Sequence, residues 1–118
     1  MKTQSNRKAG FTLVEIMIVV AIIGLLAAIA IPNFVKARAT AQKNACIANL
    51  KQIDGAVQQW ALENKKAATD TYLITDVTML AYLKGSVIPV CPGNGTYSAG
   101  TTVSGSPTCS LSASGHTL

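Results

Sequence analysis

The chain has 118 residues, which suits one small globular domain at most, and 49% of its residues are apolar although only 5% are aromatic. The formal net charge is +5, but without the first ten residues seven basic and five acidic side chains remain, and the side-chain charge falls to +2. This distribution argues against nucleic-acid binding, because such a protein needs clustered Lys and Arg and the remaining basic residues are scattered.

Residues 1–10 form a short polar segment that ends in glycine. Three of its side chains are basic: Lys2, Arg7 and Lys8. Residues 11–31 are almost entirely aliphatic, and at about 1.5 Å per residue a helix of this length crosses the roughly 30 Å hydrocarbon core of a bilayer. The sequence therefore predicts one membrane-spanning helix. Basic residues flank it on both sides, so the positive-inside rule alone does not orient it.

The helical pattern continues after this span. Pro32 removes one backbone hydrogen bond and can bend the helix, but apolar residues then recur at intervals of three and four. These residues are Cys46, Leu50, Ile53, Val57 and Trp60. We therefore expect one long helix over about residues 11–64, whose amphipathic part, residues 32–64, covers the core of a small domain. A dedicated partner-binding groove is the alternative use of the same apolar face.

Residues 65–118 have the pattern of a small C-terminal part that packs on the helix. A short helix is expected between an N-cap at Thr75 and a C-cap at Gly85. Turn-forming residues then separate three possible short strands, at residues 96–99, 101–103 and 108–111. The sequence thus predicts an α+β fold, in which a long N-terminal α-helix is packed by a short helix and a two- or three-stranded antiparallel sheet.

The junction KAGFTLVE, residues 8–15, combines a basic leader ending in glycine with phenylalanine, three further residues, glutamate and the aliphatic run. It closely resembles the class III signal peptides of type IV pilins and type II secretion pseudopilins, over about residues 7–34. The resemblance implies that a membrane-embedded aspartyl prepilin peptidase cuts between Gly10 and Phe11, removing residues 1–10, and that Phe11 is then N-methylated. An ordinary signal peptide, cut after the Ala28-Ile29-Ala30 triplet, is the alternative, but the apolar run exceeds the usual length of roughly 7–15 residues.

Glu15 interrupts the apolar span near its start. A carboxylate costs roughly 2.5–3.5 kcal/mol at the centre of a membrane helix and less towards the interface. The resemblance implies that Glu15 pairs with the Phe11 amine, in its own or a neighbouring subunit, and so favours one axial register. The alternative is a carboxyl at the headgroup level with no role in assembly. Gly24 and Pro32 bracket a stretch that the resemblance suggests can lose helicity in a filament, although both are also tolerated in membrane helices.

The chain has three cysteines, one histidine and no CxxC pair, so the spacing fits no zinc signature. We expect a disulfide between Cys91 and Cys109, which flank a turn-rich stretch; such a loop contributes about 3 kcal/mol in the chain-entropy treatment. Two alternatives stay open: Cys46 pairs with one of them, or all three are buried thiols. His116 is expected to be a solvated tail residue.

Asp70 and Asp76 are weak candidates for calcium, which several pseudopilins bind through a C-terminal loop, but they lack EF-hand spacing and solvated loop acids are the plainer interpretation. Asn94-Gly95-Thr96 matches a glycosylation sequon, yet Asn-Gly is first a turn signal. No nucleophile, base and orienting residue are grouped in the sequence. We therefore expect no enzyme and no cofactor.

The resemblance implies a structural subunit, the major subunit of a type IV pilus or of a type II secretion pseudopilus, with a slight preference for the pseudopilus because the C-terminal part is compact. Its expected partners are further copies in a helical homopolymer, the prepilin peptidase, the inner-membrane assembly platform and membrane lipid. The expected location is the bacterial inner membrane, with the C-terminal part in the periplasm, followed by an extracellular or periplasmic filament. The alternative is a minor pilin at a filament tip that binds DNA, a surface or a secreted substrate. Glu15 and the small domain favour the structural subunit.

Overall fold

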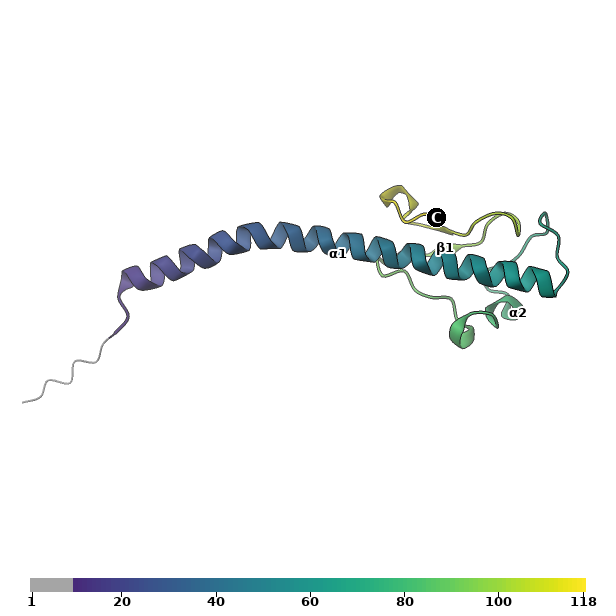
Figure 1. Ribbon diagram of the computed structural model, residues 1–118, viewed down its shortest axis with the longest axis horizontal. Coiled ribbons are helices and arrows are strands. Elements are labelled where there is room, and N and C mark those ends of the chain that lie inside the picture. The colour runs from purple at the N-terminus through teal and green to yellow at the C-terminus, as the bar shows by residue number, and fades with distance from the viewer. Residues whose placement is uncertain (1–9) are drawn as a thin grey trace, which may run out of the picture. The chain divides into compact units, whose positions relative to one another are not determined.

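The computed structural model describes residues 10–118, so the leader charges Lys2, Arg7 and Lys8 lie outside the described residues. The elements follow the order α1 (Leu13–Glu63), α2 (Val77–Leu80), η1 (Lys84–Ser86), β1 (Tyr97–Ser98), β2 (Thr108–Cys109) and η2 (Ser112–Ser114) (Figure 1). This arrangement confirms the predicted α+β fold. The chain divides into two compact units, one ending at Lys36 and the other comprising Ala37–Leu118.

The first unit contains the aliphatic part of α1. Its helix starts with a capping box, in which the N–H of Glu15 donates to Oγ1 of Thr12 and the N–H of Thr12 donates to a carboxylate oxygen of Glu15, each at 3.2 Å. Two orphan donors at the helix start are therefore satisfied by local side chains. Pro32 lies inside the helix, which remains continuous across it.

The apolar side chains of the first unit are exposed. The described helix is long and apolar enough to cross a membrane, and no part of its most apolar 18-residue window is buried within the protein. Within residues 11–31, the exposed large apolar residues are Phe11, Leu13, Val14, Ile16, Met17, Ile18, Val19, Val20, Ile22, Ile23, Leu25, Leu26, Ile29 and Ile31. An apolar surface of this extent requires a covering medium other than water.

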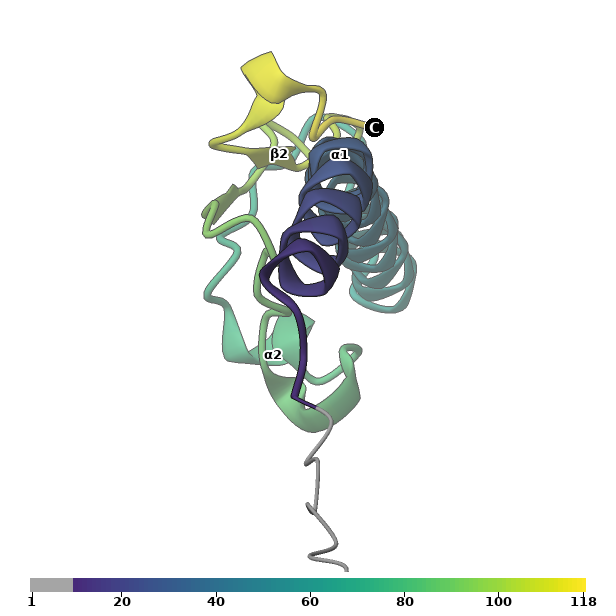
Figure 2. The ribbon, with the colours of Figure 1, turned by 90° about the vertical axis from the view of Figure 1, so that its left-hand side faces the viewer.

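The second unit is built on the later part of α1, along which the C-terminal elements lie (Figures 1 and 2). The five residues of the predicted apolar stripe are all buried: Cys46, Leu50, Ile53, Val57 and Trp60. The main core cluster joins this face to Met79, Leu83 and Val103 from the segments that follow. Burial of each such side chain contributes roughly 1.5–3 kcal/mol. The indole N–H of Trp60 donates to Oγ1 of Thr78 at 2.8 Å, so this polar group is satisfied inside the core.

The short helix α2 begins one residue later than its sequence predicts. Its N-cap is Asp76 and not Thr75, because the Asp76 carboxylate accepts hydrogen bonds from the N–H and the hydroxyl of Thr78, at 2.9 and 2.7 Å. Gly85 has a positive φ of 76°, as expected for a cap, but it lies in η1 beyond the end of α2.

The sheet has two strands, with Tyr97 opposite Cys109 in an antiparallel pair. The third possible strand, residues 101–103, is absent from the described chain because its backbone is engaged elsewhere. The N–H of Val103 donates to the carbonyl of Asp70 at 2.8 Å, in the loop after α1. Val103 is thereby buried in the main core as part of a turn.

Candidate functional site

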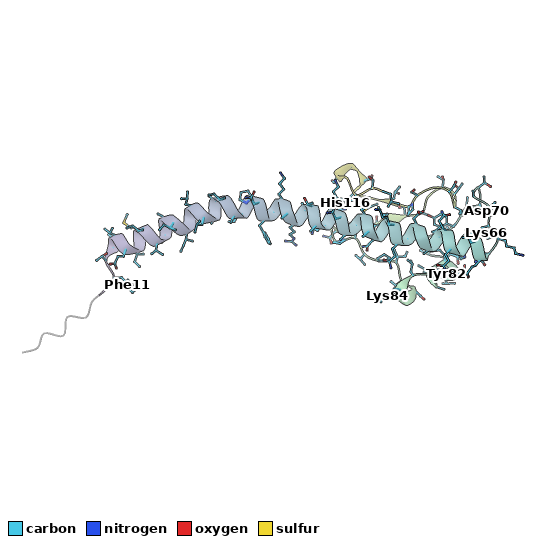
Figure 3. The ribbon with its side chains drawn as sticks, in the orientation of Figure 1. Phe11, Lys66, Asp70, Tyr82, Lys84 and His116 are labelled. Atoms are coloured by element: carbon cyan, nitrogen blue, oxygen red, sulfur yellow. The ribbon has the colours of Figure 1, made fainter. Side chains whose placement is uncertain are left out.

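The Gly10–Phe11 bond lies just before α1, outside any regular element. Both residues are exposed, and the Phe11 side chain is 87% accessible (Figure 3). A peptide bond in an exposed, irregular segment can take the extended conformation that a protease requires. The helix that follows it is capped and exposes only apolar side chains over its first turns, apart from Thr12 and Glu15.

Glu15 is brought into direct contact with Thr12. Its exposed carboxylate uses one oxygen to accept the Thr12 N–H. A carboxylate has about four acceptor positions, so capping leaves room for a further donor. The sequence signal for this contact is the Thr-x-x-Glu spacing of a capping box, which the processing motif also contains.

A second cluster of reactive side chains lies in the Ala37–Leu118 unit. Cys46, Cys91, Cys109 and His116 are all buried, and their ligand atoms all lie within 4.8 Å of one another. Sγ of Cys91 is 3.9 Å from Sγ of Cys109 and 3.7 Å from Nδ1 of His116. His116, labelled in Figure 3, is 7% exposed, so the expectation of a solvated tail residue is wrong. Packing of the segment after η2 places it in the cluster.

The turn after Cys91 shapes this cluster. Burial raises the pKa of the Cys91 thiol, but hydrogen bonds from the backbone N–H groups of Gly93 and Gly95, together with those to Cys46 and His116, outweigh it and lower the pKa to about 6. A Cβ added at Gly95 would lie 2.6 Å from Sγ of Cys109, so the sulfur atoms fit only because this residue is glycine. Burial raises the pKa of Cys46 to about 12.

The expected pair Cys91 and Cys109 are neighbours, but the structure holds all three cysteines as free thiols. Their 3.9 Å separation is well above the roughly 2.04 Å of a disulfide bond. The disulfide therefore stays a prediction, and the structure adds Cys46 and His116 to the same place. Sequence reasoning missed this fourfold cluster because its members are far apart in the chain and meet only through tertiary packing.

Comparisons with known proteins point to the N-terminal region. The family of the prokaryotic N-terminal methylation motif matches residues 5–31. The chain is 50% identical over 60 residues to the type IV major pilin protein PilA of Myxococcus xanthus, a stretch covering 51% of this chain and 27% of PilA. It is 35% identical over 64 residues to the type II secretion system core protein G of Klebsiella pneumoniae, covering 54% of this chain and 46% of that protein.

The N-terminal half of this chain is therefore similar to type IV pilins and to a type II secretion pseudopilin, and its residues 5–31 carry their methylation motif. A further relative is the type IV major fimbrial protein FimA of Dichelobacter nodosus, 48% identical over 58 residues, which cover 49% of this chain and 36% of FimA. The chain thus spans roughly a quarter to a half of the length of these pilin-family relatives. No solved structure matches it.

The two weak calcium candidates, Asp70 and Asp76, form hydrogen bonds with the local backbone. Asp70 accepts the N–H of Ala67 at 2.8 Å through its carboxylate, and Asp76 caps α2. Over residues 10–118, neither belongs to a group of three or more side chains that could hold a metal ion. Gly24 and Pro32 both lie inside α1 and are helical here, so their role in unwinding stays a prediction.

Proposed function

We propose that this chain is the precursor of a structural, non-catalytic filament subunit. It is cut between Gly10 and Phe11, held in the inner membrane by residues 11–31, and then polymerised into a type IV pilus or a type II secretion pseudopilus. The observation that carries the proposal is a capped helix whose exposed apolar segment begins directly after an accessible bond, within the methylation motif of residues 5–31.

The apolar surface of the first unit explains why membrane and filament belong together. Its side chains are exposed in the single chain, so they must be covered by lipid or by other copies. Transfer from a bilayer into a filament core exchanges one apolar environment for another. The cost of extraction is therefore offset by contacts between identical helices, and the same residues serve both states.

The leader lies entirely before the apolar span, which supports cleavage before filament assembly. Because basic residues flank the span on both sides, the proposed orientation, with a cytoplasmic N-terminus and a periplasmic Ala37–Leu118 unit, rests mainly on the resemblance of the leader to an export signal. The leader charges are Lys2, Arg7 and Lys8. Cleavage before Phe11 removes these charges and leaves the apolar helix on the product. A prepilin peptidase performs both the cut and the methylation of the new amine, so the chemistry belongs to that enzyme.

Glu15 acquires its assembly role only after cleavage. In the precursor, the nitrogen of Phe11 is a neutral amide; in the product it is a positive amine next to Thr12, whose N–H already contacts the Glu15 carboxylate. The free acceptor positions of Glu15 then bind this amine, in the same or a neighbouring copy. Inside an apolar filament core, such a pair is costly to leave unmade, so the pair between neighbouring copies favours one axial register.

The decisive experiment is mass spectrometry of the mature N-terminus after expression with and without a prepilin peptidase. The expected product begins with N-methylated Phe11 and appears only with the peptidase. A product that begins at Ile31, or a full-length chain in both samples, would contradict the proposal. Loss of secretion against loss of twitching motility, in a deletion strain, separates the pseudopilus from the pilus.

A further inference from the structure

Four buried side chains from separate parts of the second unit converge on one point. Cys46 comes from α1, Cys91 from the loop before β1, Cys109 from β2 and His116 from the segment after η2. We propose that these four residues bind one Zn²⁺ ion as a closed Cys₃His structural site. The ion ties the strand pair and the segment after η2 to α1.

The distances between the ligand atoms match a tetrahedral zinc site. With Zn–S bonds of about 2.3 Å and a Zn–N bond of about 2.0 Å, tetrahedral ligands lie roughly 3.5–3.8 Å from one another. The Cys91–Cys109 sulfur separation is 3.9 Å and the Cys91 Sγ to His116 Nδ1 separation is 3.7 Å. No pair among the four atoms exceeds 4.8 Å, so an ion at their centre reaches all of them with small side-chain shifts.

A disulfide accounts for fewer of these observations. It would use Cys91 and Cys109 alone and would leave a third thiol and an imidazole buried beside it without a function. It would also give no role to the N–H groups of Gly93 and Gly95, which point at the Cys91 sulfur. Donors aimed at a sulfur stabilise a thiolate, which is the form that a metal binds.

The surroundings suit a structural ion rather than a catalytic one. The three cysteines form a small core cluster with Leu50, and Tyr97 and Leu111 pack against it. All four zinc positions are then filled by protein, as in structural sites, and no position is left for water. Three thiolates, a neutral imidazole and Zn²⁺ carry one net negative charge.

Lys43 supplies a matching positive charge. Its Nζ would lie 2.8 Å from a Cβ placed on Gly115, so the ammonium group lies against the residue next to His116. Lys43 also stands one helical turn before Cys46 on α1. The site therefore has both its ligands and a nearby compensating charge.

The energetic reason for such a site is the size of the domain. Most buried apolar side chains of the second unit belong to the main cluster around Trp60, whereas the cluster around Cys46 has one aliphatic member, Leu50. Domains this small are commonly reinforced by disulfides or metals, because their apolar cores are marginal. Zinc binding free energy adds directly to folding free energy when the unfolded chain has no site.

The test uses the full-length chain, extracted in detergent with thiols protected from oxidation, dialysed with Zn²⁺ and then freed of loose metal. We expect one zinc per chain by elemental analysis, and an X-ray absorption spectrum with three sulfur ligands and one nitrogen. His116→Ala should weaken binding by more than about 100-fold, the upper value for loss of an outer-shell partner. Leu50→Met is the matched control, since it alters the same cluster without removing a ligand, and it should keep the zinc.

Two results would overturn the proposal. One is a Cys91–Cys109 disulfide in the chain taken directly from membranes under thiol-blocking conditions. The other is a folded wild-type chain with three alkylatable thiols that takes up no zinc. His116→Ala should still be cleaved before Phe11, so a failure of the zinc site and a failure of the proposed function give different results.

Discussion

Thr12 and Glu15 exchange two hydrogen bonds at the start of α1, each 3.2 Å long. The Glu15 carboxylate, which we propose pairs with a neighbouring subunit, therefore already caps α1 in the single chain. Capping uses one oxygen and reduces the cost of a carboxylate near the apolar span. Capping and intersubunit pairing are therefore compatible, and they depend on different properties of Glu15: the first needs an acceptor oxygen, and the second needs a negative charge.

This difference makes two variants informative. Glu15→Gln keeps an acceptor at the third helical position, so the helix start should persist, but it removes the charge that binds the Phe11 amine. We expect normal cleavage and at least a tenfold loss of sheared filaments, which corresponds to about 1.4 kcal/mol. Quantitative immunoblots of sheared filaments and mass spectra of the membrane pool measure the two effects.

The matched control for that prediction is Thr12→Ala. It removes the hydroxyl cap and costs about 1 kcal/mol of local helix stability, but it retains the negative charge. Filament yield should stay near that of the wild type. If Glu15→Gln assembled normally while Thr12→Ala did not, the capping contact would matter and the proposed charge pair would be wrong.

The buried face of α1 predicts that two aliphatic residues of this helix contribute very differently to the stability of the second unit. Ile53 is fully buried in the main cluster, whereas Leu62 is 81% exposed. Ile53→Ala should lower the free energy of unfolding of the second unit by roughly 2–5 kcal/mol, and Leu62→Ala by no more than about 0.5 kcal/mol. Thermal unfolding and limited proteolysis of the full chain in detergent report both. Equal effects would show that this face is not the core.

The long helix and its buried face could be predicted from the sequence. Apolar residues spaced three and four apart, from Cys46 to Trp60, all lie on one face of a helix. The sequence places the N-cap of α2 one residue too early, because Thr75 and Asp76 are both good caps and only the hydrogen bond to Thr78 distinguishes them. The strand expected at residues 101–103 does not form, because the N–H of Val103 donates to the carbonyl of Asp70, in a loop distant in sequence.

The cluster of three sulfur atoms and one imidazole could not be predicted from the sequence, because it too depends on contacts between residues that are distant in the chain. Cys46 and His116 belong to no common motif and have no local periodicity that relates them. Only the packing of β2 and the following segment against α1 brings them together. The processing site is therefore predicted from local signals alone, whereas the sulfur and imidazole cluster depends on contacts that no local sequence pattern contains.

The cap of α2 predicts an acid-sensitive contribution to stability. A hydrogen bond from the Thr78 hydroxyl, together with one from its N–H, lowers the pKa of Asp76 below its ordinary value. Because the folded pKa is depressed, the stabilisation is present above the unfolded pKa of about 3.9 and is lost as the pH falls through the folded pKa. Asp76→Asn keeps a capping oxygen without the charge, so its unfolding temperature should fall less between pH 5 and pH 3, taken as approximate limits. An unchanged pH profile in that variant would assign the acid sensitivity to other groups.

Two glycines predict opposite responses to the same substitution. At Gly95, an added Cβ would stand 2.6 Å from Sγ of Cys109 and 3.1 Å from Leu111, so Gly95→Ala must displace the buried sulfur cluster and should destabilise the second unit. At Gly55, on the exposed side of α1, an added Cβ has nothing within 4 Å. Gly55→Ala should therefore raise the free energy of unfolding by about 0.5–1 kcal/mol, the helix-propensity difference between the two residues. Thermal unfolding of both variants, with thiol accessibility measured in parallel, checks the contrast. Protected thiols and unchanged stability in Gly95→Ala would mean that the sulfur atoms are not packed against this turn.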